Sequence, residues 1–417
     1  MTARDDWQNY INLLHSGNYV KLARLDFLQP DGSVAFVLDN NALNRRAGAF
    51  IQEGTLSVNL QNGQRRKAEV TLSNLDGAYD YNINKIWFGQ QVRLMMGVLL
   101  PDGRPYYIPQ GVFYLQDPED VFKPGQKSVV YTLVDKAAYL DGTLFGNLDG
   151  IYEIALGENI FEAITSILQM DRGNGTPIDN LLPVFTDYYT NKTVDLPDGT
   201  TISVLVTPYT YRCDSESGTY WEIIKELATM LAAWIGYDST GRLRLIPSNQ
   251  DMDDITKSVL WNFTPAEVNF LGATYTVNAS EVYNDIIVLG ESLDDNPQAR
   301  GRATNTNVKS DTESQVMGLR TKMMTASGYY ADEQCQELAE WYLKRYTVLQ
   351  KSVTIECGQI FHIEENELVT IKRTDKEGSP VEKHLVTGFS LPIGQVGAMT
   401  INATSVNDLS GNSSYSA

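Results

Sequence analysis

The sequence predicts a mainly β protein with an α+β insertion, in which one antiparallel β region precedes the insertion and another follows it. Residues 18–140 hold a succession of strand patterns and hardly any helical pattern. Two amphipathic helices then appear, and strand patterns return from Ala273. Short strands at near-regular spacing are typical of antiparallel barrels and sandwiches. A chain of 417 residues is also long enough for about two to four domains.

An N-terminal helix is expected over residues 1–17. Trp7, Ile11 and Leu14 recur at helical spacing, and Gly17 is suited to ending a helix. The first β region follows, over residues 18–150. Its predicted strands include Val20 to Leu28, Val34 to Leu38, Val92 to Val98, Tyr106 to Leu115 and Ser128 to Val134.

The clearest hairpin of this region runs from Gly54 to Asn82. Apolar and polar residues alternate in two runs, so that each strand has one buried face. The apolar positions are Leu56, Val58, Leu60, Ala68, Val70 and Leu72. Asn62-Gly63 lies between the runs and accepts the positive φ of a type I′ turn. Nothing in the hairpin is chemically reactive, so we expect it to be scaffolding that a second layer covers.

Residues 151–264 predict a small α+β insertion domain. Helices are expected at Glu158 to Met170 and at Tyr220 to Trp234, each with one apolar stripe. Thr219 and Glu222 have the spacing of a capping box at the start of the second helix. Extended structure makes up the rest, with a turn at Pro197-Asp198-Gly199 and a strand at Arg242 to Ile246.

The second β region covers residues 265–406. Its expected strands are Thr274 to Asn278, Asp285 to Leu289, Ser352 to Cys357, Glu367 to Arg373, His384 to Leu391 and Ala398 to Ala403. A long polar loop is predicted over 291–327, and such loops in compact domains are usually functional or ordered by a partner. A helix is expected over 331–346, and residues 407–417 are expected to form a flexible tail.

The composition excludes several classes of protein. Lys and Arg number 33 against 52 Asp and Glu, a net charge of −19, which disfavours a DNA-reading role or binding to an anionic membrane. Cys213, Cys335 and Cys357 are far apart, which favours buried thiols over disulfides or a zinc site. The N-terminus lacks the pattern of a signal peptide, and no run reaches the ~18 apolar residues of a membrane span. We therefore expect no membrane segment and synthesis in the cytoplasm.

No catalytic, cofactor-binding or metal-binding residue is assigned. His15, His362 and His384 lie outside any HExxH motif and are expected at the surface or partly packed. The His362-Ile363-Glu364-Glu365 stretch is interpreted as solvated polar surface, with metal binding as the weaker alternative. Asp251 to Asp254 lacks the glycine and distal glutamate of a calcium loop and is interpreted as a charged linker. The usual acyl-transfer and nucleotide-binding motifs are missing from the sequence.

Two other features leave alternatives open. A glycosidase needs only two positioned carboxylates, so the abundant acidic residues leave that activity possible. The 23 tyrosines and 6 tryptophans could stack on sugars, although aromatic residues in β-rich proteins more often fill cores and interfaces. Arg45-Arg46 and Arg65-Arg66-Lys67 are the dense basic spots and are interpreted as exposed partner contacts, the second also discouraging edge pairing.

Several stretches carry a family likeness through their order and spacing. They are VTLSNLDGAYDYN at Val70 to Asn82, FGQQVRLMMGV at Phe88 to Val98, YIPQGVFYLQDPED at Tyr107 to Asp120, EVYNDIIVLGE at Glu281 to Glu291, NELVTIK at Asn366 to Lys372 and AMTINA at Ala398 to Ala403. Together with the helix over 331–346, they resemble the hub proteins at the distal end of bacteriophage tails, also called baseplate hub proteins.

The resemblance implies that residues 18–150 and 265–406 are two antiparallel β-barrel domains like those of the tail tube. In the hub family, a homotrimer arranges such domains as a pseudo-sixfold ring that continues the tube. The implied partners are the tail tube and the distal tail, tail-tip or baseplate proteins, with the tape measure protein as a further candidate. Genomic DNA would contact the ring only in transit, because an acidic channel wall has little affinity for phosphate.

The function expected from this resemblance is that of a non-enzymatic structural hub in the virion tail, assembled in the host cytoplasm. The 291–327 loop and the insertion helices are the candidate contact elements. The chain ends soon after the second β region, so we expect any cell-wall hydrolase to be another polypeptide. The alternatives are a tail-associated cell-wall glycan hydrolase and a carbohydrate-binding adhesin.

Overall fold

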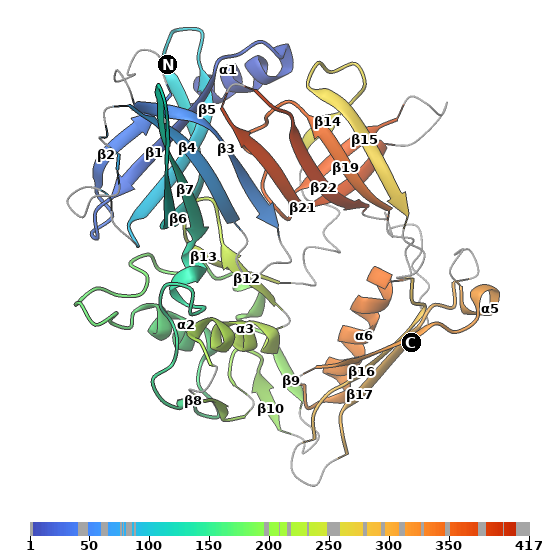
Figure 1. Ribbon diagram of the computed structural model, residues 1–417. Helices are drawn as coiled ribbons and strands as arrows, with labels where there is room; N and C mark the ends of the chain where they lie inside the picture. Colours follow the sequence, from blue (N-terminus) through green and yellow to red (C-terminus); the bar gives the residue numbers. More distant parts are fainter. Residues whose placement is uncertain are drawn as a thin grey trace.

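The computed structural model describes residues 3–40, 49–59, 66–75, 77, 79–80, 86, 89–195, 200–207, 209–214, 218–231, 233–247, 259–277, 282–292, 297–307, 313–326, 329–346, 351–373, 381–394 and 396–405. Its elements are labelled in Figure 1.

The first β region follows the predicted helix, which is present as α1 (Ala3–Ser16). Its strands are β1 (Lys21–Leu28), β2 (Val34–Asp39), β3 (Ala49–Asn59), β4 (Arg66–Asn74), β5 (Gln91–Leu99), β6 (Pro105–Lys123) and β7 (Gln126–Asp135), followed by the short 3-10 helix η1 (Lys136–Tyr139). The strands of the predicted hairpin are confirmed, because β3 pairs antiparallel with β4 and places Leu56 opposite Ala68. The Asn62-Gly63 turn lies outside the described residues.

The insertion contains both predicted helices and several short strands. In chain order it holds β8 (Tyr152–Ile154), α2 (Ile160–Leu168), η2 (Asp187–Tyr189), β9 (Thr193–Asp195), β10 (Thr201–Ser203), β11 (Tyr211–Cys213), α3 (Tyr220–Met230), β12 (Ala233–Tyr237) and β13 (Leu243–Pro247). The predicted capping box is confirmed: the Thr219 hydroxyl accepts from the Glu222 amide, and the Glu222 carboxylate accepts from the Thr219 amide. At α2, Asn159 caps the helix by accepting from the amides of Phe161 and Glu162.

The C-terminal part alternates between strands and helices. It holds β14 (Val259–Phe263), β15 (Phe270–Val277), β16 (Asp285–Leu289), β17 (Arg300–Thr304), α5 (Ser314–Met317), β18 (Thr321–Thr325), α6 (Asp332–Tyr346), β19 (Lys351–Cys357), β20 (Leu368–Lys372), β21 (Val381–Ile393) and β22 (Met399–Ser405). The predicted helix over 331–346 is therefore confirmed as α6.

Strands of both β regions join in one 13-stranded sheet, in the order β15-β19-β22-β21-β3-β4-β7-β6-β5-β1-β2, with β14 and β20 attached at β21. The connection between the regions is the antiparallel pair β21–β3, in which Phe389 lies opposite Val58 and Leu391 opposite Leu56. In Figure 1 the blue strands of the first region continue into the red strands of the second. The predicted hairpin thus lies where the two regions join.

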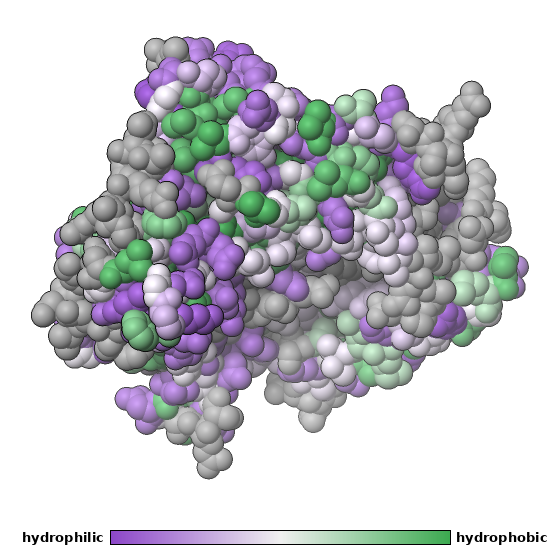
Figure 2. Space-filling model, turned by 45° about the horizontal axis from the view of Figure 1, so that its top comes forward, coloured by the Kyte–Doolittle hydropathy of each residue, from purple (hydrophilic) through white to green (hydrophobic). Residues whose placement is uncertain are grey.

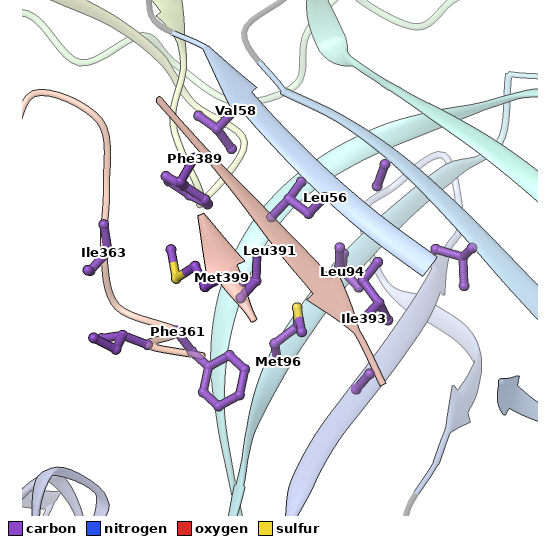
Figure 3. Close-up of a cluster of buried hydrophobic side chains, with 14 of the residues drawn as sticks. Leu56, Val58, Leu94, Met96, Phe361, Ile363, Phe389, Leu391, Ile393 and Met399 are labelled. Atoms are coloured by element: carbon purple, nitrogen blue, oxygen red, sulfur yellow. The ribbon is translucent and has the colours of Figure 1, made fainter. Parts of the chain in front are cut away.

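One hydrophobic core underlies this sheet and takes residues from both regions. Leu56 and Leu94 of the first region share it with Phe361, Leu391 and Met399 of the second, and Figure 3 shows these side chains pointing toward one another. Burying a large apolar side chain contributes about 1.5–3 kcal/mol, so the two regions stabilise each other. The mainly β class is confirmed, while the division into tube-like domains at 18–150 and 265–406 stays a prediction.

Three smaller clusters lie outside the main core among the described residues, and the smallest holds Tyr114, Val134 and Ala138. The core of the insertion forms between α2, α3 and the β12–β13 hairpin, with Ile164, Ile224 and Leu245 among its buried residues. A third core lies between α6 and the three-stranded sheet β17-β16-β18, and its members include Ile286, Val288 and Cys335. Figure 1 shows the insertion and this α6 unit beneath the large sheet, and the ring of Tyr209 in the insertion contacts the ring of Tyr330, just before α6, at 5.5 Å.

The predicted loop over 291–327 is wrong where the structure has β17, α5 and β18. The β17 part of this stretch contains no large apolar residue, because Gly301 and Ala303 are the residues that face α6. A side chain on Gly301 would meet the backbone of Cys335 in that helix. Close approach of the helix therefore requires a residue without Cβ, which removes the alternation that marks a strand.

The predicted end of the second insertion helix is also wrong. The helix α3 stops at Met230, and Trp234 belongs to β12, where it pairs with Ile246 of β13. The turn of this hairpin is held by Asp238, whose carboxylate accepts from the amides of Thr240 and Arg242. Aromatic and β-branched residues fit a paired strand better than a further helical turn.

Candidate interaction surfaces

The structure gives no sign of a metal site among the residues that it describes: no three His, Cys, Asp or Glu side chains are placed to hold an ion. No described helix is long and apolar enough to cross a membrane. The cysteines are free thiols; Cys335 and Cys357 are buried as predicted, and Cys213 is half-buried.

An aromatic cluster fixes α1 to the second β region. The Tyr10 hydroxyl lies 2.9 Å from Nδ1 of His362 and accepts from the Phe361 amide at 3.2 Å. The Trp7 ring contacts His362 edge-on at 5.1 Å, and His15 stacks on Trp261 at 4.6 Å. Burial lowers the pKa of His362 to about 4, so the ring is neutral near pH 7 and packs as an aromatic residue.

Arg66 forms a buried charge cluster between the two β regions. Its side chain is 1% exposed, lies on β4 and binds the carboxylates of both Glu364 and Glu365, the latter at 2.7 Å. It also donates to the Gln110 carbonyl at 2.9 Å. The carboxylates come from the loop before β20. Through these ion pairs and its hydrogen bond to Gln110, Arg66 connects strands of the first region to a loop of the second.

A second buried ion pair attaches the insertion to the sheet. Lys136, in η1, binds the Asp179 carboxylate and the Gly241 carbonyl, the latter at 3.0 Å. Both side chains of the ion pair are almost completely buried. Burial lowers the pKa of Lys136, and the Asp179 charge opposes that shift. This pair therefore depends on both partners being present.

These clusters correct three predictions. Glu365 is buried, Glu364 is 30% exposed, and both bind Arg66 rather than forming an open polar surface. Arg66 itself is not an exposed partner contact. His384 is completely buried on β21, between β20 and β22, and is not a surface residue. Each lies on or beside a strand that acquires neighbours from distant parts of the chain, which no local pattern reveals. The sequence shows both the acidic pair Glu364-Glu365 and the basic run that contains Arg66. It does not show that the two bind each other.

Other predicted residues lie outside the described part of the chain. They are Arg45-Arg46, Arg65, Pro197-Asp198-Gly199, Asp251 to Asp254 and the tail 407–417.

The large sheet has an open edge at each end. β2 pairs only with β1 and β15 pairs only with β19 among the described strands. Both edges carry exposed apolar side chains, Val34 and Val37 on β2 and Leu271 on β15. In Figure 1 the two strands lie on opposite sides of the molecule. Unpaired strand edges present free backbone donors and acceptors and readily pair with another chain.

A third surface projects from the α6 unit. The exposed residues Val316, Met317, Leu319 and Met323 lie in one short stretch, and we call them the α5–β18 patch; Val316 is 72% exposed and Met323 62%. Figure 2 shows hydrophobic atoms at the margin of the molecule where α5 projects. Sequence reasoning chose the 291–327 stretch as a contact element for its polarity and overlooked these apolar residues.

Comparison with known proteins finds solved structures with a similar fold. No protein-family model matches the chain, and no curated protein matches it in sequence. A tail protein from Neisseria meningitidis superposes with a TM-score of 0.57 at 10% identity, covering 94% of this chain and 98% of that one. A 43 kDa tail protein of a Shewanella oneidensis prophage gives 0.55 at 11% identity, covering 93% and 98%. A prophage tail protein from Listeria monocytogenes gives 0.54 at 10% identity, covering 92% and 94%.

These matches span nearly the whole of each chain, insertion included. The protein therefore has the fold of prophage tail proteins. At this level of identity the likeness establishes the architecture, and it bears out the family resemblance seen in the sequence at the level of fold.

Proposed function

We propose that this chain is a non-enzymatic structural hub at the distal end of a phage tail. In this proposal three copies form a ring that continues the tail tube and joins it to tail-tip or baseplate proteins. The protein would be assembled in the host cytoplasm and reside in the virion tail. The fold shared with prophage tail proteins supports the proposed location in a phage tail.

The observation that carries the proposal is the pair of open edges on one continuous sheet. β2 and β15 are different strands at opposite ends of the sheet order. A contact between two different surfaces is heterologous, and repeated copies then form a ring if the rotation closes. Pairing of β15 in one copy with β2 in the next would extend the sheet around such a ring and bury the exposed Val37 and Leu271.

The copy number and the partners follow from the family resemblance. Two tube-like lobes in each copy give six lobes in a trimer, which would match a sixfold tube. The tape measure protein would be a further partner, and DNA would pass through the channel without specific contacts. The net charge of −19 supports that role, because phosphate affinity comes chiefly from Lys and Arg.

The test is the mass of the purified chain by light scattering over a range of concentrations, followed by negative-stain imaging. Rings with a central hole are expected for the wild type. Val37→Lys and Leu271→Lys each place a charge at an open edge and should give monomers with unchanged thermal unfolding. Val20→Lys alters an exposed valine that precedes β1 and serves as the matched control.

A wild-type chain that stays monomeric alone and when mixed with tail-tube protein would contradict the hub. Two assays then separate the other classes. Release of soluble fragments from purified peptidoglycan would identify a hydrolase, and retention on immobilised glycans without release would identify an adhesin.

A further inference from the structure

The α5–β18 patch is held in place by an ordered backbone. Asn284 is completely buried, and its amide group donates to the Gly318 carbonyl at 2.8 Å and accepts from the Arg320 amide at 2.8 Å. Its own backbone amide donates to the Arg320 carbonyl at 3.2 Å. The segment between α5 and β18 is thus fixed on both sides of Leu319. A surface ordered before binding loses less entropy when a partner docks.

The helix α6 covers one face and one edge of this small sheet. It packs on one face, and it also closes the outer edge of β17, where Asp332 accepts from the Arg300 amide at 2.8 Å and Gln336 accepts from the Arg302 amide at 3.0 Å. On the other side, β18 pairs with β16 alone among the described strands. The open part of the unit is therefore the side that carries the exposed apolar residues, as expected of a docking surface.

We infer that a second copy of this chain docks on the α5–β18 patch through the side of its insertion that carries α2. The inference rests on the proposed head-to-tail ring. In Figure 1, α5 and β15 lie toward one side of the molecule and α2 and β2 toward the other. A contact that brings β15 against the β2 of the next copy therefore directs the patch toward the α2 side of that copy.

Charge and hydrophobicity match this occupant. Arg320 and Lys322 border the patch and lie over the Tyr283 ring, at 5.9 Å and 5.1 Å. The chain as a whole carries −19, so another copy is an acidic partner for a locally basic border. On the α2 side, the segment after α2 exposes Leu182, and Asp187 is exposed beside it in sequence.

The test places a photo-crosslinking benzoylphenylalanine at Leu319 of the full chain. We expect irradiation to give covalent dimers, with crosslinked peptides from the α2 segment of the partner copy, residues 160–190. In parallel, the double variant Leu319→Glu/Met323→Glu should raise the dissociation constant of the assembly by about tenfold or more, as for central apolar contacts. Its thermal unfolding should stay at the wild-type value. Leu75→Glu, at another exposed leucine, is the matched control.

The outcomes separate this inference from the proposed ring. Rings that form normally with the double variant, and crosslinks confined to other segments, would overturn the inference and leave the edge contact standing. Loss of tail incorporation with normal rings would assign the patch to a different protein and would also overturn it. Monomers at all concentrations, both alone and when mixed with tail-tube protein, in the wild type and in every variant, would overturn both.

Discussion

Arg66 is a buried charge at the junction of the two β regions, and removing its guanidinium from water costs free energy. The arginine is buried, and its guanidinium faces two carboxylates from a loop almost 300 residues away in the chain. Burying a charge is tolerated only when it is paired and hydrogen-bonded. The cluster therefore fixes how the loop before β20 lies on β4.

Replacing Arg66 should destabilise the folded protein. Arg66→Met removes the cation and leaves Glu364 and Glu365 facing each other, so the free energy of unfolding should fall by about 3–5 kcal/mol. Denaturant unfolding followed by fluorescence measures it. Lys67→Met, at the exposed neighbour on the same strand, should change stability by less than about 0.5 kcal/mol. Equal effects of the two variants would contradict the buried cluster.

His362 should make stability depend on pH. Burial lowers the pKa of its folded form from 6.5 to about 4. Below pH 6.5 the unfolded chain binds a proton that the folded chain does not, so stability falls between pH 6.5 and about 4. The loss from this residue should reach about 3 kcal/mol at most.

The measurement is denaturant unfolding at pH 7 and pH 4.5 for the wild type and His362→Gln. The variant should lose less stability on acidification than the wild type. An unchanged slope in His362→Gln would assign the acid sensitivity to other groups.

Sequence patterns predicted the residues with local signals and missed those defined by distant contacts. Thr219 and Glu222 lie three residues apart, so their capping box could be predicted. The burial of Arg66 depends on a loop almost 300 residues away, and the burial of His384 depends on the pairing of β21 with both β20 and β22. A basic residue after a hairpin turn is typically exposed at a sheet edge. Arg66 is buried instead because the loop with Glu364 and Glu365 packs against it.

At the scale of elements, α6 depends on the small residues of β17. Gly301 lies under the helix, where an added Cβ would meet the Cys335 backbone. A Cβ added to Gly272 on β15 would meet no other atom within 4 Å. Gly301→Ala should therefore force the helix away from the sheet and lower stability by about 1–3 kcal/mol. Gly272→Ala should be close to neutral or slightly stabilising.

Hydrogen exchange locates the effect. The Gly301→Ala variant should lose protection in α6 and β16 before the large sheet does, because the α6 unit has its own core. A loss spread evenly over both sheets would argue that the two units unfold together.

The elements themselves were largely predictable, and their limits less so. Period-two alternation identified the hairpin strands β3 and β4, and in β4 buried and exposed positions alternate from Arg66 to Val70. Trp234 was assigned to a helix because the apolar stripe of α3 continues through it in sequence, although the chain has already turned into β12. Pairing with β13 decided that boundary, and strand pairing is not visible in the residues of one segment.

At the scale of the whole molecule, buried polar contacts connect the two β regions and attach the insertion to the large sheet. Arg66 joins the β regions, and Lys136 with Asp179 joins the large sheet to the insertion. The register of β21 on β3, the joint of the sheet, links residues more than 300 positions apart. The mainly β class could be read from the sequence, whereas this continuity required the structure. Attachment of the insertion matters for the ring, because the proposed second contact uses its α2 side.

Lys136 and Asp179 allow that attachment to be tested with compensating changes. Lys136→Met leaves the Asp179 carboxylate buried without its cation, which should cost about 3–5 kcal/mol. Adding Asp179→Leu removes the unpaired carboxylate and should restore most of the lost free energy of unfolding. About 1 kcal/mol should remain lost, because Asp179 no longer accepts the hydrogen bond from the Leu181 amide. Lys225→Met, at an exposed position on α3, controls for loss of a lysine in the same domain.

Hydrogen exchange distinguishes detachment of the insertion from general destabilisation. In Lys136→Met we expect protection to fall first in η1 and the β12–β13 hairpin, since Lys136 binds the Gly241 carbonyl between these strands and lies over the Tyr237 ring, while β3 and β21 keep theirs. The double variant should restore protection in the insertion. If it stays as unprotected as the single variant, the pair contributes specific geometry that apolar packing does not replace, and the ring contact on the α2 side should weaken with it.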